Sequence, residues 1–258
     1  MPTTACRQSR QESIASDHPI RRFGTSCFWQ RSPGMRWGPG GDGHVTIVTV
    51  ATMKGGSGKS TIASCLAVRW HLKGRRPSIV DADPQCSIAR LASRERALGG
   101  IPVIADSSEA AWQAARGLAA SGGPVIIDTP GFRSETTIAC LAASDFVLVP
   151  VKPSPFDVDR MLDTLNVLIN GVSGWRPTFR CLLTQTTRDS VIAKHIRAEL
   201  AEAGFPLLKN EMTNRVAYAE AALWGATPNL LDATGPAARE IAAIADEVDV
   251  ILAMKQAA

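Results

Sequence analysis

The chain has 258 residues, of which 45% are hydrophobic and 20% charged, and its formal net charge is +4. This length and composition are typical of a globular chain with one well-buried α/β core, and they exclude a disordered or fibrous protein. The sequence contains no apolar run of about eighteen residues, the length that indicates a membrane span, and its carboxyl-terminal segment lacks a basic amphipathic pattern. We therefore expect no membrane partner.

The six cysteines form no C-x-x-C pair and show no spacing typical of metal ligands. Cysteines without such a pattern usually act as small buried apolar residues in a reducing compartment. We therefore predict reduced, buried thiols in a cytoplasmic protein.

Most of the net charge lies in residues 1–44, which hold six arginines, no lysine and three acidic residues and therefore carry +3. This segment has no hydrophobic periodicity and ends in a glycine-rich sequence, so we predict a disordered basic extension before one domain at 45–258. The codons for Gly40, Gly41 and Asp42 can include a purine-rich ribosome-binding sequence. An alternative hypothesis is therefore that 1–44 is a translated upstream leader and that the native chain starts at Val45.

From Val45 onward, apolar runs of strand length alternate with segments of helical periodicity. The predicted strands lie within 45–51, 76–85, 123–131, 144–155 and 178–186. The predicted helices lie within 60–74, 107–120 (with a serine cap), 157–170 and 188–204, and near 215–224 and 236–254. This alternation predicts a doubly wound α/β fold with a mostly parallel sheet covered on both faces. Ligands of such sheets bind at the carboxyl ends of the strands.

The first predicted strand leads into "KGGSGKST" at 54–61, and a predicted helix follows. Its three glycines allow the backbone to bend around a polyphosphate and to present several N–H groups, which the start of the helix reinforces. Lys59 is placed to reach the β- and γ-phosphates of a nucleotide, and Ser60 to hold Mg²⁺. The pattern departs from the usual phosphate loop at Met53, which replaces the first glycine, and it contains a second lysine, Lys54. A purely structural turn is disfavoured because strand, loop and helix occur in the order that phosphate binding requires.

Three aspartates follow predicted strands at the same edge of the sheet. Asp128 ends "VIID", where a phosphate-loop enzyme holds the acid that orients Mg²⁺ and its waters. Asp81 and Asp83 lie in "VDADPQ", and one of them is placed to hold the attacking water or a magnesium-bound one. For Asp81, a structural role in the turn before Pro84 is the better interpretation.

Four segments, "KGGSGKST", "VDADPQ", "VIIDTPG" and "VLVPVKPSPFDVD", resemble in order and spacing the ParA family of deviant Walker A phosphate-loop ATPases, and its compact ParF-like branch in particular. The resemblance covers roughly residues 45–255. It implies that ATP is bound by the whole loop, namely Lys54, Gly55, Gly56, Ser57, Gly58, Lys59, Ser60 and Thr61.

The same resemblance implies individual roles around the loop. Lys54 matches the family's signature lysine, which crosses to the phosphates of the partner subunit in a nucleotide sandwich dimer and joins Lys59 in catalysis. Asp83 matches the aspartate that activates water. Asp128 matches the acid that is associated with Mg²⁺ through water, and Ser60 binds the ion directly.

Residues 175–215 contain seven basic and four acidic side chains, a local charge of +3. ParA-like dimers bind DNA without sequence preference through basic residues of carboxyl-terminal elements, so the resemblance implies a DNA-binding face here. The candidate contacts are Arg188, Lys194, Arg197 and Arg215. The alternative for any one of them is an ordinary solvated helix face with ion pairs between neighbouring turns.

The resemblance implies a cytoplasmic, nucleoid-associated and Mg²⁺-dependent ATPase that dimerises on ATP, binds DNA nonspecifically and positions a cargo. A ParB-like protein or another cargo adaptor would stimulate slow hydrolysis, and the cargo would be a plasmid or chromosomal centromere complex. A protein cargo, such as a carboxysome or a chemoreceptor cluster, is the first alternative. Alternatives of another class are a MinD-like membrane ATPase, a metal-cofactor insertase and an inactive nucleotide-binding dimer. The last is disfavoured because Lys54, Lys59, Ser60, Asp83 and Asp128 are all present.

Overall fold

The computed structural model describes residues 46–154, 164 and 178–256. These residues belong to one compact unit of the chain, Pro39–Ala258. The predicted extension at 1–44 lies outside the described residues, as does the predicted helix at 157–170 apart from Thr164.

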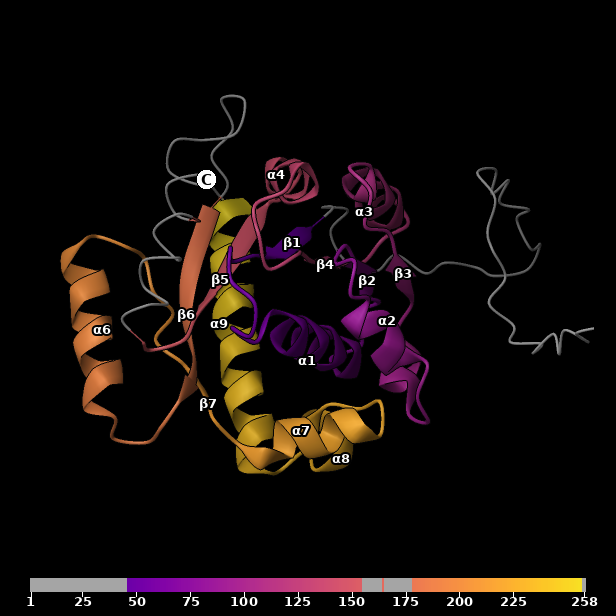
Figure 1. Cartoon of the computed structure of the whole chain (residues 1–258). Helices are drawn as coiled ribbons and strands as arrows, with labels where there is room; N and C mark the ends of the chain where they lie inside the picture. The colour runs from indigo at the N-terminus through magenta and orange to yellow at the C-terminus, as the bar shows by residue number, and fades with distance from the viewer. Residues whose placement is uncertain (1–45, 155–163, 165–177, 257–258) are drawn as a thin grey trace, which may run out of the picture. The chain divides into compact units, whose positions relative to one another are not determined.

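The described residues form a sheet of seven strands, all paired in parallel (Figure 1). Its order is β3-β2-β4-β1-β5-β6-β7, so strands are added on both sides of β1. The strands are β1 (Ile47–Val50), β2 (Ser78–Asp81), β3 (Val103–Ala105), β4 (Val125–Asp128), β5 (Phe146–Val151), β6 (Thr178–Thr186) and β7 (Met212–Thr213). The predicted doubly wound α/β fold is confirmed, and the sheet is parallel throughout.

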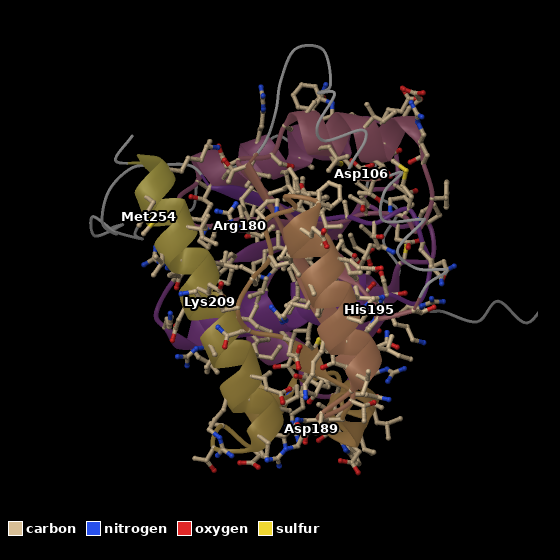
Figure 2. The ribbon with its side chains drawn as sticks, turned by 90° about the vertical axis from the view of Figure 1, so that its left-hand side faces the viewer. Asp106, Arg180, Asp189, His195, Lys209 and Met254 are labelled. Carbon is tan, nitrogen blue, oxygen red and sulfur yellow. The ribbon has the colours of Figure 1, made fainter. Side chains whose placement is uncertain are left out.

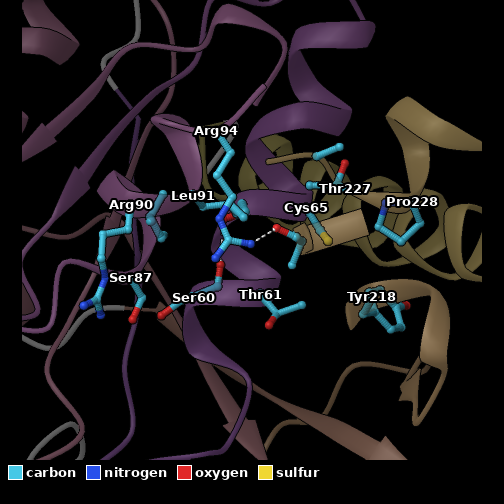
Figure 3. A pocket seen from close by; sticks show the side chains of 14 residues that line it. Ser60, Thr61, Cys65, Ser87, Arg90, Leu91, Arg94, Tyr218, Thr227 and Pro228 are labelled. Atoms are coloured by element: carbon cyan, nitrogen blue, oxygen red, sulfur yellow. Dashed lines mark hydrogen bonds between the residues drawn. The ribbon is translucent and has the colours of Figure 1, made fainter. Parts of the chain in front are cut away.

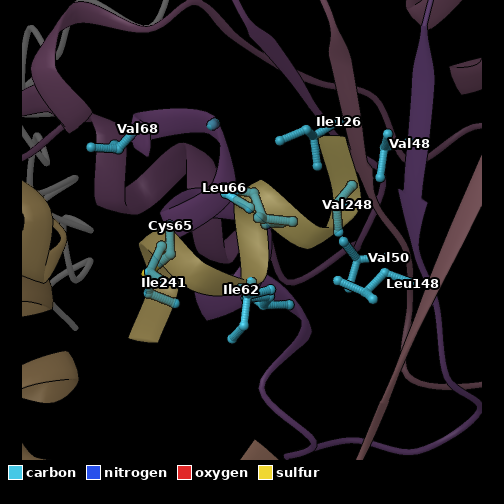
Figure 4. Packing of buried hydrophobic residues seen from close by; sticks show 14 of the residues in the cluster. Val48, Val50, Ile62, Cys65, Leu66, Val68, Ile126, Leu148, Ile241 and Val248 are labelled. Atoms are coloured by element: carbon cyan, nitrogen blue, oxygen red, sulfur yellow. The ribbon is translucent and has the colours of Figure 1, made fainter. Parts of the chain in front are cut away.

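One face of the sheet is covered by helices from both ends of the domain. They are α1 (Lys59–Leu72), α2 (Ser87–Ala92), α7 (Val216–Leu223), α8 (Pro228–Leu231) and α9 (Pro236–Gln256). Leu66 of α1 and Val248 of α9 are fully buried in one apolar cluster with Val48 and Val50 of β1 (Figure 4). This cluster holds α1 firmly against the sheet, and with it the loop that precedes α1.

The opposite face is covered by α3 (Ala111–Ala120), α4 (Glu135–Ala142) and α6 (Val191–Glu202). Along β1, Ile47 is buried on the α3 side and Val48 on the α1 side. Strands buried on both faces read as continuous apolar runs, which is why most of them could be recognised in the sequence.

The structure adds elements that hydrophobic patterning did not predict. They are β3, β7, α2, α4, α8 and a 3₁₀ turn at Ala97–Gly100. Such short elements bury few side chains and leave little periodic signal. The predicted serine cap of the helix at 107–120 is wrong: α3 begins at Ala111 after Ala110, whose side chain cannot cap. Ser108 instead donates its hydroxyl to Asp106 Oδ1 at 2.6 Å.

Candidate functional site

The carboxyl ends of β1, β4 and β2 bring the glycine-rich loop and two aspartates to one edge of the sheet. In the parallel register, Val50 of β1 pairs with Asp128 of β4, and Asp128 pairs with Asp81 of β2. The loop leaves β1 at this point, and α1 begins at Lys59. The loop therefore lies where ligands bind in a doubly wound sheet.

The loop requires glycine at two positions with left-handed backbone conformation. Gly56 has a φ of 77° and Gly58 a φ of 90°, which residues with a side chain adopt only at a cost. Gly58 is also the N-cap of α1. The first amides of a helix lack intrahelical partners, so the start of α1 presents free N–H groups to the loop.

A third glycine is required by close backbone packing. A Cβ atom on Gly131 would lie 2.9 Å from the amide nitrogen of Gly55 and 3.0 Å from its Cα. The segment after β4 therefore packs directly against the glycine-rich loop. This close approach is the physical reason for the glycine of "DTPG" at 128–131.

Lys59 is buried at the base of the loop, with 6% of its surface exposed. Its Nζ donates a hydrogen bond to the carbonyl oxygen of Lys54 at 2.9 Å. Burial lowers the pKa of Lys59, whereas Asp128 and Asp83 raise it. Lys59 thus lies within electrostatic reach of both predicted acids, and an anionic ligand would favour its charged form further.

The carboxylate of Asp128 is fully buried, and neither of its oxygens accepts a hydrogen bond. Burial is the main reason that the pKa of Asp128 is raised to about 7. Asp81 and Asp83 raise this pKa as well, whereas Ser60 and Lys59 lower it. The Ser60 hydroxyl is close enough to Asp128 to lower this pKa, although the two groups do not meet the geometry of a hydrogen bond. A buried carboxylate without partners is costly unless a cation meets it.

These features fit a Mg²⁺ site. Mg²⁺ prefers oxygen ligands and retains several waters, so proteins usually hold it with one or two side chains together with substrate phosphates. Ser60 and Asp128 supply such oxygens between the loop and β4. Within the described part of the chain, no group of three or more His, Cys, Asp or Glu side chains could hold a metal ion by itself. A Mg²⁺ ion here would therefore take its other ligands from a nucleotide and water.

The two aspartates that follow β2 differ in their contacts. Asp81 is fully buried, and its Oδ2 accepts hydrogen bonds from the amides of Ile88 and Ala89 at the start of α2, both at 2.9 Å. Its Oδ1 also accepts from the amide of Asp83 at 3.4 Å. Asp81 therefore has the structural role in the turn that the sequence favoured, and it holds the start of α2 as well. Asp83 is half-buried, and its charge raises the pKa of Lys59. Of this pair, Asp83 is the one that bound water can reach.

Sequence reasoning missed residues that fix the loop and its neighbours from elsewhere in the chain. The Thr164 hydroxyl accepts a hydrogen bond from the amide of Met53 at 3.0 Å, which anchors the position where a glycine is usual. Thr129 Oγ1 donates to the carbonyl of Val50 at 3.0 Å and ties β4 to the end of β1. Thr184 and Gln185, near the end of β6, also donate hydrogen bonds to the loop. A position at the carboxyl end of a strand is the signal that could have suggested the β4 and β6 residues.

A cavity of about 500 Å³ opens beside the start of α1, between α1, α2, α7 and α8 (Figure 3). Ser60 and Thr61 line it next to the loop, and Arg90, Arg94 and Tyr218 line it further along. Its volume lies within the range of small-molecule sites. The cavity therefore adjoins the loop and is large enough for the remainder of a nucleotide.

Two of the four candidate DNA contacts project into solvent. Arg188 and Lys194 have 96% and 72% of their side chains exposed. Each lies near Asp189, at 3.8 and 3.9 Å, which is too far for a strong ion pair. Figure 2 shows the face that carries α6 and α9, with Asp189 labelled near the start of α6.

The other two candidates are engaged within the domain. Arg197 lies 3.2 Å from Glu211 and donates to the carbonyl of Leu208 at 2.9 Å. Arg215 lies 2.6 Å from Glu240, which raises the pKa of its guanidinium through a hydrogen bond. The four candidates are therefore not equally available to DNA: two are solvated, and two are paired with glutamates.

Three of the four cysteines in the described ranges, Cys65, Cys140 and Cys181, are buried, and burial raises the pKa of each thiol to about 12. Cys86 is only half-buried. The expectation of buried thiols thus holds for three of these four residues. None of the helices described by the structure is long and apolar enough to cross a membrane.

A glycine-rich loop between a buried strand and a helix, with a strand-end acid beside it, defines a phosphate-loop nucleotide-binding protein. The family model for the CobQ/CobB/MinD/ParA nucleotide binding domain matches residues 48–228. The chain belongs to this family, as the sequence motifs predicted.

Individual relatives agree with this assignment. Maintenance of carboxysome distribution protein A of Gloeobacter kilaueensis is 30% identical over 210 residues, which are 79% of this chain and 94% of that protein. Protein ParA of Rhizobium radiobacter is 26% identical over 177 residues, which are 67% of this chain and 80% of that protein. The structure of the septum site-determining protein MinD of Pyrococcus horikoshii OT3, complexed with Mg-ADP, has a TM-score of 0.65 at 17% identity and covers 81% of this chain and 98% of its own. At this level of identity, the similarity to MinD shows a shared fold.

Proposed function

We propose that this protein is an ATPase that dimerises on ATP, binds DNA nonspecifically and uses this cycle to position a cargo. The observation that carries the proposal is the convergence of Lys59, Asp83 and Asp128 at the glycine-rich loop. Membership of a nucleotide-binding family supports the use of a nucleotide. Relatives named ParA and maintenance of carboxysome distribution protein A support the positioning role.

The site residues divide the work of hydrolysis among them. The loop amides and Lys59 would bind the phosphates of ATP, and Lys59 would exchange its bond to the Lys54 carbonyl for a phosphate oxygen. Ser60 and Asp128 would hold Mg²⁺, which neutralises phosphate charge when bound. Asp83 would orient the water that attacks the γ-phosphorus. The bond between that phosphorus and the β,γ-bridging oxygen of ATP would break, this oxygen would leave as a terminal oxygen of ADP, and the proton of the attacking water would pass to the released phosphate.

Lys54 would act between two subunits. Its side chain is half-buried beside the loop. In a nucleotide-bridged dimer, a cation delivered by one subunit neutralises phosphates that are bound by the other, so ATP itself would hold the dimer together. Hydrolysis would weaken this contact, and a ParB-like or other cargo adaptor would accelerate it.

The DNA-binding part of the proposal rests on exposed cations. Arg188 and Lys194 are the best placed of the four candidates because their side chains are solvated. Nonspecific binding needs only phosphate contacts, and it weakens steeply with salt. A dimer presents these residues twice, so DNA binding would follow ATP-driven dimerisation and keep the ATP-bound protein on the nucleoid.

Two kinds of cargo remain candidates. A plasmid or a chromosomal centromere complex is the first candidate, on the resemblance to the ParA family. The relative that is 30% identical and named for carboxysome distribution supports a protein assembly. The two differ in the adaptor that stimulates hydrolysis rather than in the nucleotide site. Imaging the labelled protein in its own host, beside a labelled plasmid or protein assembly, distinguishes them.

The test of this function is binding of a nonspecific DNA duplex to the full chain with ATP, ADP or no nucleotide, at two salt concentrations. Asp83→Ala serves as the variant expected to bind ATP without hydrolysing it. Binding that requires ATP, falls with salt and persists in Asp83→Ala supports the proposal. If DNA does not bind in any nucleotide state, the DNA-based mechanism is wrong. Anionic lipid vesicles in place of DNA then test for a membrane-associated ATPase.

A further inference from the structure

We propose that Thr184 and Gln185, near the end of β6, are positioning residues that hold the phosphate loop in its binding conformation before a nucleotide arrives. The inference rests on the proposed function, because the conformation of this loop matters only if it binds phosphates. Neither residue belongs to the loop motif. They lie 127 and 129 positions along the chain from the loop residues that they contact.

Thr184 holds the loop from within the sheet. Its side chain is fully buried, and its Oγ1 donates to the carbonyl oxygen of Ser57 at 2.9 Å. Pairing of Thr184 with Met212 of β7 fixes its backbone, and its β-branched side chain has few rotamers, so the direction of the hydroxyl is set. Without this donor, the Ser57 carbonyl would lose a buried hydrogen bond.

Gln185 reaches the loop because β6 is irregular at this residue. The register between β6 and β7 shifts between Thr184 and Thr186, and Gln185 has a φ of 53°. In a regular strand, consecutive side chains point to opposite faces, so Thr184 and Gln185 could not both contact the loop. The irregularity allows Gln185 Nε2 to donate to the carbonyl of Gly56 at 2.6 Å. A left-handed conformation is costly for glutamine, and such strain is often retained at functional sites.

These two hydrogen bonds orient the amides of the loop. In a planar trans peptide, the N–H group points opposite to the C=O group of the same unit. Holding the carbonyls of Gly56 and Ser57 toward β6 therefore turns the N–H groups of Ser57 and Gly58 away from β6 and into the loop. Because the loop is already ordered in this way, phosphate binding loses less conformational entropy.

The test measures the dissociation constant of the full chain for Mg-ADP by calorimetric titration, together with steady-state ATP hydrolysis. Thr184→Val keeps the shape of the side chain and removes the donor. We expect the dissociation constant and the KM for ATP to rise about three- to tenfold, the range for one neutral hydrogen bond, with kcat unchanged. Thr184→Ser should restore binding. Gln185→Ala, at a more exposed position that tolerates truncation, should show a similar shift.

Thr186→Val is the matched control, because Thr186 is fully buried on the same strand and its hydroxyl has no hydrogen-bond partner. Thr186→Val should bind Mg-ADP with the dissociation constant of the wild type. A rise in this constant equal to that of Thr184→Val would overturn the inference. Wild-type binding in both Thr184→Val and Gln185→Ala, with binding abolished in Lys59→Ala, would also overturn it and leave the proposed function intact. Binding that survives Lys59→Ala would instead contradict the proposed function.

Discussion

Charged residues differ in burial between two regions of the molecule: the edge of the sheet that carries the glycine-rich loop, here called the loop edge, and the exposed surface around α6, here called the α6 face. At the loop edge, Lys59 and Asp128 are buried, and each shifts the pKa of the other. On the exposed surface around α6, Arg188 in the preceding turn and Lys194 on the helix project into solvent. A buried charge acts at one position that its neighbours fix, whereas exposed cations act on DNA mainly through their number and density. The first region therefore depends on particular residues, and the second on accumulated charge.

The largest effect is expected at the loop edge. Lys59→Ala removes the buried cation and should lower ATP turnover by at least about a hundredfold, because phosphoryl transfer depends on stabilising the developing charge. Release of inorganic phosphate measures this. Lys54→Ala is the matched lysine variant: it should bind ADP as a monomer but fail to dimerise with ATP, as sedimentation would show. Undiminished turnover in Lys59→Ala would mean that the site is assigned wrongly.

A smaller effect is expected on the α6 face. Combining Arg188→Glu with Lys194→Glu should weaken ATP-dependent DNA binding about tenfold and flatten its salt dependence, because each lost phosphate contact reduces counterion release. Thermal stability should not change, because neither side chain is buried. Arg116→Glu on α3 alters the net charge elsewhere and serves as the control. If it weakened DNA binding as much as the double variant, the face would be wrongly placed.

The buried carboxylate of Asp128 predicts a pH effect on stability. Its pKa is raised from 3.8 to about 7. The protonated form is therefore favoured in the folded state, and this stabilisation is fully present below the ordinary pKa and lost as the pH rises through about 7. Without nucleotide or Mg²⁺, the uncharged variant Asp128→Asn should melt about 3 °C or more above the wild type at pH 8, and by less at pH 5. Thermal melts at the two pH values measure this, and equal shifts at both would contradict it.

The smallest effects distinguish paired from solvated arginines. Arg197→Ala removes the contact with Glu211 and the hydrogen bond to the Leu208 carbonyl. It should lower the melting temperature by about 1–3 °C, since one partly exposed ion pair and one hydrogen bond are lost. Arg188→Ala, which loses no strong contact, should melt as the wild type does. Equal melting temperatures of the two variants would contradict the distinction between a paired Arg197 and a solvated Arg188.

Sequence spacing was sufficient where function depends on one strand and the loop that follows it. The apolar run before "KGGSGKST" predicted a phosphate loop, and the parallel direction of the strands predicted that Asp83 and Asp128 lie at the same edge of the sheet as this loop. The same reasoning failed at the start of α3, because the Ser108 hydroxyl accepts from the amide of Ala110, one residue before the helix begins, and donates to Asp106. It also could not detect β3 or β7, which are too short to carry periodicity.

The sequence by itself determined the fold class, the phosphate loop and the acids beside it, because these depend on residue types at short spacing. Only the tertiary structure decided that Asp81 holds the start of α2, that Arg197 and Arg215 are already paired, and that Thr184 and Gln185 support the loop. The contacts of Thr184 and Gln185 with the loop join residues that lie 127 and 129 positions apart in the chain. They arise from the order in which strands assemble in the sheet, and no local pattern encodes that order.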